Sequence, residues 1–220
     1  MVREVIDSGG RAYHHGNLRE VLVAAGVELA REGGPNAVLL RAASREAGVS
    51  HNAAYRHFAN HEDLLAAVAE RCMTCLSRLM LERMQAVTAR GTVRRAQARL
   101  EAIGRAYIDF ARTEPGWFRT AFSSARAHAS GDLPSEGQRL ACESAEAIPG
   151  PYELLNAALD ELVTVGALTP ARRVGAEYAA WSAVHGMSSL LLDGPLRDLP
   201  EPEAQHAIGA VLTVVNRGLQ

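Results

Sequence analysis

Apolar residues recur every three or four positions along most of the 220 residues of this chain. This spacing places them on one face of an α-helix, where they can pack against a core. The pattern predicts helices over residues 17–32, 40–46, 51–58, 61–89, 93–113, 151–165, 169–192 and 203–217. It also allows a helix over residues 136–147, inside a segment rich in Ala, Ser, Gly and Pro. We therefore expect an all-α protein.

Composition supports this interpretation and narrows the class of protein. Hydrophobic residues make up 48% of the chain, and Ala and Leu predominate over β-branched residues, which favours helices. There is no run of about 18 apolar residues and no apolar signal core near the start, so we expect a cytoplasmic protein without a membrane span. The net charge of −2 gives no overall basic field. Residues 1–12 are charged and glycine-containing, which predicts a disordered arm.

Two of the predicted helices, residues 40–46 and 51–58, are separated only by the turn Ala47-Gly48-Val49-Ser50. Gly48 can adopt the left-handed conformation that ends the first helix. Ser50 can cap the second helix by accepting a hydrogen bond from the amide of Asn52 or Ala53. Two short helices joined in this way form a helix-turn-helix, whose second helix fits the major groove of DNA.

The second of these helices carries side chains that suit DNA. Asn52 can pair with the edge of an adenine through two hydrogen bonds. Tyr55 and Arg56 suit phosphate oxygens, which position a protein on the duplex. The other candidate DNA-binding residues here are Arg41, Ser50, His51, His57 and His61. The alternative is a helix-turn-helix used only for packing.

Residues 47–65 read AGVSHNAAYRHFANHEDLL, and this phrase resembles the DNA-binding signature of the TetR family of one-component bacterial repressors. Residues 181–186, WSAVHG, resemble the Trp-His-Gly type of TetR ligand-binding domain. The resemblance implies a three-helix DNA-binding domain over residues 1–62 and a larger helical domain for ligand binding and dimerisation over residues 63–220. It also favours contact between the DNA backbone and Tyr13, His14 and His15, a segment that could otherwise be only a loop.

The implied function is that of a transcriptional regulator and not of an enzyme. The family pattern is a homodimer on a palindromic double-stranded DNA operator, from which a small apolar or amphipathic effector releases a repressor. The dimer would form through helices at about residues 171–192 and 203–217. The alternative is a dimeric DNA-binding regulator with no small-molecule effector. Two departures from the family pattern bear on DNA affinity: Leu39 replaces a Ser or Thr, and His61 replaces a Lys.

An effector of this kind needs a mainly apolar pocket with a few polar groups. The aromatic residues and one histidine of the C-terminal half are the candidates: Tyr107, Phe110, Trp117, Phe118, Phe122, Tyr178, Trp181 and His185. Each of these could instead be a core residue. His185 is the most informative, because it is a polar group on an otherwise apolar helix face, although it could also lie at a dimer interface.

Metal, redox and enzyme chemistry receive little support from the sequence. Cys72 and Cys75 form a C-x-x-C within a predicted helix, but no second pair accompanies them, so we interpret them as small apolar core residues rather than a metal or redox site. An enzyme with its site near Trp117 would need a nucleophile–base pair, a phosphate-binding loop or a metal-ligand set, and no such pattern occurs. We therefore expect no cofactor and no metal.

Overall fold

The computed structural model describes residues 18–123 and 148–219, and every regular element within these ranges is helical. The α-helices are α1 (Leu18–Gly33), α2 (Leu40–Glu46), α3 (His51–Tyr55), α4 (His61–Gln85), α5 (Thr92–Thr113), α6 (Pro115–Ser123), α9 (Pro151–Thr164), α10 (Pro170–Arg173), α11 (Ala176–Leu192) and α12 (Glu201–Gly218). A short 3-10 turn, η1 (Pro35–Ala37), links α1 to α2. The expected all-α fold is confirmed. The helix that the sequence allows over residues 136–147 lies outside the described residues.

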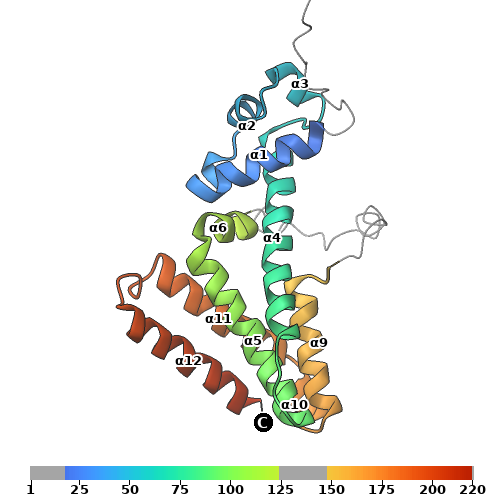
Figure 1. Ribbon diagram of the computed structural model, residues 1–220, viewed down its shortest axis with the longest axis vertical. Helices are drawn as coiled ribbons and strands as arrows, with labels where there is room; N and C mark the ends of the chain where they lie inside the picture. Colours follow the sequence, from blue (N-terminus) through green and yellow to red (C-terminus); the bar gives the residue numbers. More distant parts are fainter. Residues whose placement is uncertain (1–17, 124–147, 220) are drawn as a thin grey trace, which may run out of the picture.

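The helices form two packed groups along one long axis (Figure 1). Helices α1, α2 and α3 gather at one end, and α4 runs from this group toward the opposite end. Helices α5 and α9 pack against the far part of α4, α11 and α12 pack against α5, and α6 lies between the two groups. Each group has its own buried hydrophobic cluster, and Met73, Trp117 and Phe122 pack against both clusters. Helix α4 and these three side chains therefore join the two groups.

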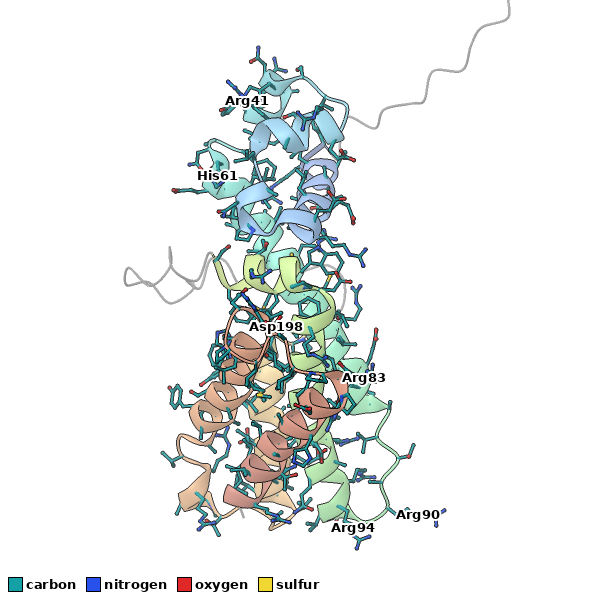
Figure 2. The ribbon with its side chains drawn as sticks, turned by 90° about the vertical axis from the view of Figure 1, so that its left-hand side faces the viewer. Arg41, His61, Arg83, Arg90, Arg94 and Asp198 are labelled. Carbon is teal, nitrogen blue, oxygen red and sulfur yellow. The ribbon has the colours of Figure 1, made fainter. Side chains whose placement is uncertain are left out.

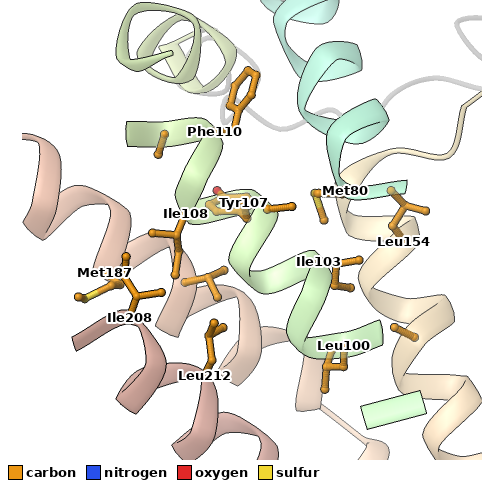
Figure 3. Packing of buried hydrophobic residues seen from close by; sticks show 14 of the residues in the cluster. Met80, Leu100, Ile103, Tyr107, Ile108, Phe110, Leu154, Met187, Ile208 and Leu212 are labelled. Carbon is orange, nitrogen blue, oxygen red and sulfur yellow. The ribbon is translucent and has the colours of Figure 1, made fainter. Parts of the chain in front are cut away.

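Helix α5 is the centre of the larger cluster (Figure 3). Its residues Leu100, Ile103, Tyr107 and Phe110 are buried, as their spacing predicted. Val93 lies in the first turn of α5 and is 38% exposed. The residues that surround α5 in the close-up come from four helices: Met80, Leu154, Met187, Ile208 and Leu212. The core is thus assembled around one central amphipathic helix.

Local backbone features shift several predicted helix boundaries. Helix α4 ends at Gln85 rather than at residue 89, and Gly91, with φ 86°, directly precedes α5. The expected helix over residues 169–192 is interrupted at Gly175, whose φ of 79° is left-handed, so it forms α10 and α11 instead. The second helix of the helix-turn-helix ends at Tyr55 rather than at residue 58.

The buried face of α11 leaves out two of the aromatic residues that the sequence analysis placed in a pocket or in the core. We expected Tyr178 and Trp181 to point inward, but their side chains are 64% and 37% exposed. The buried face consists of Ala176, Ala180, Val184, Met187, Ser188 and Leu191. Small residues at this face let α11 approach α5 closely, and the large aromatic rings are left at its edges.

Helix α6 rests directly on the end of α1 through Gly116. A β-carbon built at Gly116 would lie 2.2 Å from the carbonyl oxygen of Ala30 and 2.4 Å from that of Arg31. Real β-carbons do not approach closer than 3.0 Å, and backbone atoms cannot swing aside as a side chain can. The close approach of the two helices therefore requires glycine at this position.

We predict that Gly116→Ala lowers the free energy of unfolding by about 1–3 kcal/mol, because the added methyl group forces α6 away from α1. Urea denaturation followed by circular dichroism measures this change. The matched control is Gly218→Ala in the last turn of α12, where a β-carbon meets nothing within 4 Å. This control should keep or slightly raise stability, since Ala is the better helix former. Equal denaturation midpoints for the two variants would contradict the prediction.

Candidate nucleic-acid interface and ligand cavity

The helix-turn-helix is held by the local interactions that its sequence predicted. Gly48 has a φ of 67°, and the Ser50 hydroxyl accepts a hydrogen bond from the Ala53 amide at 3.2 Å. Ala43 of α2 and Ala54 of α3 are fully buried in the smaller hydrophobic cluster. Their burial fixes both short helices against α1 and α4 and leaves the opposite face of α3 to solvent.

The solvent-facing side of α2 and α3 carries the candidate DNA-contacting groups. Asn52, Arg56 and His57 are exposed, and half of the Tyr55 side chain is exposed. Arg41 is exposed on α2, and Figure 2 shows it at the end of the molecule formed by α1, α2 and α3. Three other candidates, Tyr13, His14 and His15, lie outside the described residues. The exposed groups of α2, α3 and the turn after α3 thus include an amide, a phenol and two guanidinium groups.

His51 is partly buried, whereas Asn52, Tyr55, Arg56 and His57 are exposed. Its ring lies edge-on against Tyr55, with ring centroids 4.6 Å apart. Its Nδ1 atom is buried without a hydrogen-bond partner. His51 therefore supports the ring of Tyr55 from within the first turn of α3.

The two departures from the family pattern, Leu39 and His61, lie at the starts of α2 and α4. Leu39 precedes α2 with no side-chain capping bond, and its side chain is 48% exposed. His61 is the first residue of α4 and is partly exposed. Helix α4 is capped by Asn60, whose side-chain oxygen accepts a hydrogen bond from the Asp63 amide at 2.8 Å. The Asp63 carboxylate in turn accepts a hydrogen bond from the Ala59 amide. The cap thus fixes α4 relative to α3.

A cavity of about 1600 Å³ extends from the group of α1, α2 and α3 into the larger helical group. At its upper end it touches Val23 and Phe58, and it continues along α4 past Met73. Lower down it lies among α5, α9, α11 and α12, where Tyr107 and Trp181 form part of its wall. Of the eight predicted ligand-binding residues, Tyr107, Phe122 and Trp181 line it.

Tyr107 and Trp181, which line this cavity, form a hydrogen-bonded group with His185. The buried Tyr107 hydroxyl lies 2.8 Å from His185 Nδ1 and accepts a hydrogen bond from Trp181 Nε1 at 3.3 Å. Burial raises the pKa of the Tyr107 hydroxyl and lowers the pKa of the His185 imidazole, because both charged forms lose hydration. Both side chains are therefore neutral near pH 7. Phe118 and Phe122 pack on the His185 ring at centroid distances of 5.7 and 5.0 Å.

The remaining predicted ligand-binding residues lie elsewhere. Trp117 faces α1: its Nε1 donates to the Val27 carbonyl oxygen at 2.8 Å. Phe110 stacks against Trp117 with ring centroids 6.3 Å apart. Tyr178 is on the outer surface of α11. The structure therefore brings five of the eight together, namely Tyr107, Phe118, Phe122, Trp181 and His185, and places two at the contact with α1.

Several lining residues were missed by the sequence analysis. Gly104 and Leu212 line the cavity from α5 and α12, and Tyr152 lines it from the first turn of α9. A β-carbon at Gly104 would lie 2.8 Å from Leu212 Cδ2 and 3.4 Å from Val184 Cγ1, so glycine at this position lets α11 and α12 pack closely against α5. No pattern in the sequence identifies Tyr152 or Leu212, since they come from separate helices.

Cys72 and Cys75 have the surroundings of core residues. Cys72 is fully buried and Cys75 is partly buried. Burial raises the pKa of the Cys72 thiol to about 12, so the reactive thiolate is scarce at neutral pH. Within the described ranges, no group of three or more His, Cys, Asp or Glu side chains could hold a metal ion.

Comparison with known proteins identifies the family. Residues 100–214 match the model of the tetracyclin repressor-like C-terminal domain, and residues 22–68 match that of the bacterial regulatory proteins of the tetR family. The chain belongs to the TetR family. It has the fold of a transcriptional regulator with a DNA-binding helix-turn-helix, and regulators of this family bind DNA operators as dimers. No curated protein matches the chain.

Solved structures share the fold of this TetR-family chain over most of its length. A protein with unknown function from Rhodococcus sp. RHA1 is 25% identical, with a TM-score of 0.72 and coverage of 96% of this chain and 99% of that one. A TetR-family transcriptional regulator from Pectobacterium atrosepticum is 19% identical, with a TM-score of 0.62 over 91% and 93%. The transcriptional regulator FadR from Bacillus subtilis, in complex with stearoyl-CoA, is 15% identical, with a TM-score of 0.60 over 91% and 99%. None of the helices in the described ranges is long and apolar enough to cross a membrane.

The lowered pKa of His185 predicts a pH dependence of stability. Because the imidazole is less basic in the folded than in the unfolded chain, the unfolded chain binds more protons once the pH falls below the unfolded pKa of about 6.5. The stabilising contribution is present above that pH and is lost as the pH falls toward the folded pKa. Urea denaturation should therefore show a smaller loss of stability between pH 7.5 and 5.5 for His185→Asn than for the wild type.

His206→Asn is the matched control for this pH series, because His206 is an exposed histidine on α12. It should retain the wild-type dependence on pH. A His185→Asn variant that follows the wild-type curve in parallel over the whole range would show that burial of His185 has no part in the pH dependence.

Proposed function

We propose that this TetR-family protein is a dimeric repressor that binds a palindromic operator through α3 and is released by a small-molecule effector bound in the cavity. One observation carries the proposal: an exposed polar face on α3 is connected, through α4 and α6, to a large aromatic-lined cavity. We assign residues 1–62 to DNA binding and residues 63–220 to ligand binding and dimerisation.

The proposed DNA contacts follow from exposure and chemistry. Asn52 is the candidate for reading an adenine edge, and Tyr55, Arg56 and Arg41 are candidates for phosphate. His57 and His61 would lie near the same backbone. Ser50 contributes by capping α3, and His51 by supporting Tyr55.

The proposed release mechanism uses the contacts between α6 and α1. Phe122 lines the cavity, and in the same helix Trp117 donates to the Val27 carbonyl oxygen of α1. Arg31 of α1 adds a two-pronged ion pair with Glu114, at 2.6 and 2.9 Å. An effector that displaces Phe122 would thus move α6 and, with it, α1. In a dimer, this shift favours a state whose two α3 helices no longer match successive major grooves, about 34–36 Å apart.

The cavity also bears on the choice between an effector-controlled regulator and one without an effector. A regulator whose C-terminal half serves only dimerisation would be expected to fill its interior with side chains. A cavity of about 1600 Å³ is large enough for a drug-sized ligand and more. It therefore favours an effector.

A second, apolar groove between α11 and α12 supports dimerisation through these helices. It is lined by Ala183, Gly186, Met187, Leu190, Ala210, Val211, Val214 and Val215. Val214 is 69% exposed and Leu190 is 42% exposed, and exposed apolar side chains gathered in one patch mark protein–protein contact sites. The small residues Ala183, Gly186 and Ala210 would let a second copy of the same helices approach closely.

The Asn52→Ala variant tests the proposal that α3 contacts the bases of the operator. Fluorescence anisotropy measures binding to DNA from upstream of the protein's own gene, with unrelated DNA as the reference. Loss of the adenine contact should weaken specific binding about 10- to 100-fold and leave binding to unrelated DNA unchanged. The matched control is Asn36→Ala, because Asn36 is exposed in η1, on the side of the domain that contacts α6. Equal loss of specific affinity in both variants would argue against α3 as the helix that contacts the operator bases.

The proposed dimer is tested by Val214→Glu. A carboxylate in the apolar groove would have to be buried without a partner, so we expect monomers at micromolar concentration. Sedimentation velocity measures the mass. Val174→Glu is the matched control, since Val174 is 85% exposed but lies between α10 and α11, away from the groove. A Val214→Glu variant that remains dimeric would move the interface to another surface.

A further inference from the structure

The surface formed by α2, α3 and the start of α4 carries equal numbers of acidic and arginine side chains. Residues 40–63 contain three of each, and all six are exposed. They are Arg41, Arg45, Arg56, Glu46, Glu62 and Asp63. The whole chain has a net charge of −2, so there is no overall basic field that attracts DNA. Because affinity for DNA depends strongly on cations that neutralise phosphates, any further positive charge on this surface matters.

Histidine is the residue type that can add such charge here. The same stretch contains His51, His57 and His61, and an imidazole gains a proton between about pH 8 and pH 5. His57 is exposed directly after Arg56, and His61 is partly exposed at the first position of α4. Figure 2 shows His61 at the same end of the molecule as Arg41. Among the described residues, neither the His57 nor the His61 imidazole has a hydrogen-bond or ion-pair partner.

His51 is less suited to take up a proton than the other two histidines. Its Nδ1 atom is buried without a hydrogen-bond partner, and its ring lies edge-on against Tyr55. A proton on this atom would be a buried N–H donor without an acceptor, which is unfavourable. In the part of the chain that the structure describes, His57 and His61 have no such buried, unpartnered nitrogen.

The charged groups that α1 brings to His57 are already engaged. Arg19 and Glu20 of α1 line the wall of the large cavity together with His57. The Arg19 guanidinium lies 5.1 Å from the centre of the Phe58 ring. Glu20 forms an ion pair with Arg71 of α4 at 2.5 Å. These groups therefore leave His57 without a dedicated partner of either sign.

The charged groups beside His61 belong to the first turn of α4. The Asp63 carboxylate accepts a hydrogen bond from the Ala59 amide, and Glu62 has no ion-pair partner within the described ranges. Helix α2, which packs against α3, contributes Arg41, Arg45 and Glu46. One proton on each of His57 and His61 would therefore change a balanced surface into one with a net charge of +2.

We propose that DNA binding by this protein is coupled to proton uptake at His57 and His61, so that affinity for DNA rises as the pH falls from 8 to 6. Phosphates of a bound duplex favour the protonated imidazole, because a nearby opposite charge stabilises the charged form. By linkage, protons taken up on binding increase the affinity toward acid pH. The inference rests on the proposed binding of DNA through α3 and adds pH as a second control besides the effector.

Fluorescence anisotropy at pH 8 and pH 6, at equal ionic strength, tests the coupling. The probes are a duplex from upstream of the protein's own gene and an unrelated duplex. Phosphate contacts do not depend on sequence, so affinity for both duplexes should be at least about tenfold higher at pH 6. In a salt series, the negative slope of log affinity against log salt should be steeper at pH 6 by about two, since each phosphate contact contributes about 0.9.

The outcomes of this experiment separate the coupling from DNA binding itself. Equal affinities and equal salt slopes at the two pH values would overturn the coupling and leave DNA binding through α3 intact. Absence of binding to either duplex at pH 6 and low salt, by a chain that circular dichroism shows to be folded, would overturn both.

Variants test whether His57 and His61 are the groups that take up the protons. The double variant His57→Gln, His61→Gln should show a pH effect below about threefold, with an unchanged melting temperature. His61→Lys should bind more tightly than the wild type at pH 8 and lose about half of the pH effect on log affinity, because lysine stays charged at both pH values. His206→Gln, at an exposed position of α12, is the control and should keep the whole effect. A double variant with the wild-type pH effect would overturn the assignment to these two residues.

Discussion

The contact between the start of α6 and the end of α1 is the constraint on which the arrangement of the two helical groups depends. Within four residues, Glu114 pairs with Arg31, Gly116 meets the Ala30 carbonyl oxygen, and Trp117 donates to Val27. A partly buried indole N–H needs an acceptor, and here the acceptor is a backbone carbonyl of the DNA-binding end. A charge pair, a close backbone approach and a directional hydrogen bond therefore act at one place. Each of these three interactions ties the position of α6 to that of α1.

The cavity next to this contact requires that its polar groups satisfy one another. The Tyr107 hydroxyl is buried at the cavity wall, and a buried hydroxyl without a partner costs about 1–3 kcal/mol. Trp181 and His185 supply the partners, from the same helix α11. The three side chains hold α5 and α11 together where the core is hollow. Phe118 and Phe122 of α6 pack against this group, so the wall of the cavity and the contact with α1 belong to one short helix.

The sequence predicted the parts of this structure that depend on local interactions. The turn at Gly48, the Ser50 cap and the buried face of α5 follow from residue type and spacing, and the structure has them all. The errors arise where packing between helices decides. Trp117 was expected in the ligand pocket because it is a large aromatic residue, but its partner on α1 is 90 residues distant in sequence. The buried face of α11 depends on which helices surround it, so its aromatic residues could not be placed from periodicity alone.

The similarity of this fold to solved structures and the chemistry of its cavity depend on different residues. The three solved structures compared above are 25% identical or less, so they support the arrangement of helices but not the side chains around the cavity. The aromatic residues that line the cavity come from four helices, with Tyr107 on α5, Phe122 on α6, Tyr152 on α9 and Trp181 on α11. No motif records such a set, and each member by itself would be an ordinary core or surface aromatic residue. Only the folded chain brings them to the wall of one cavity.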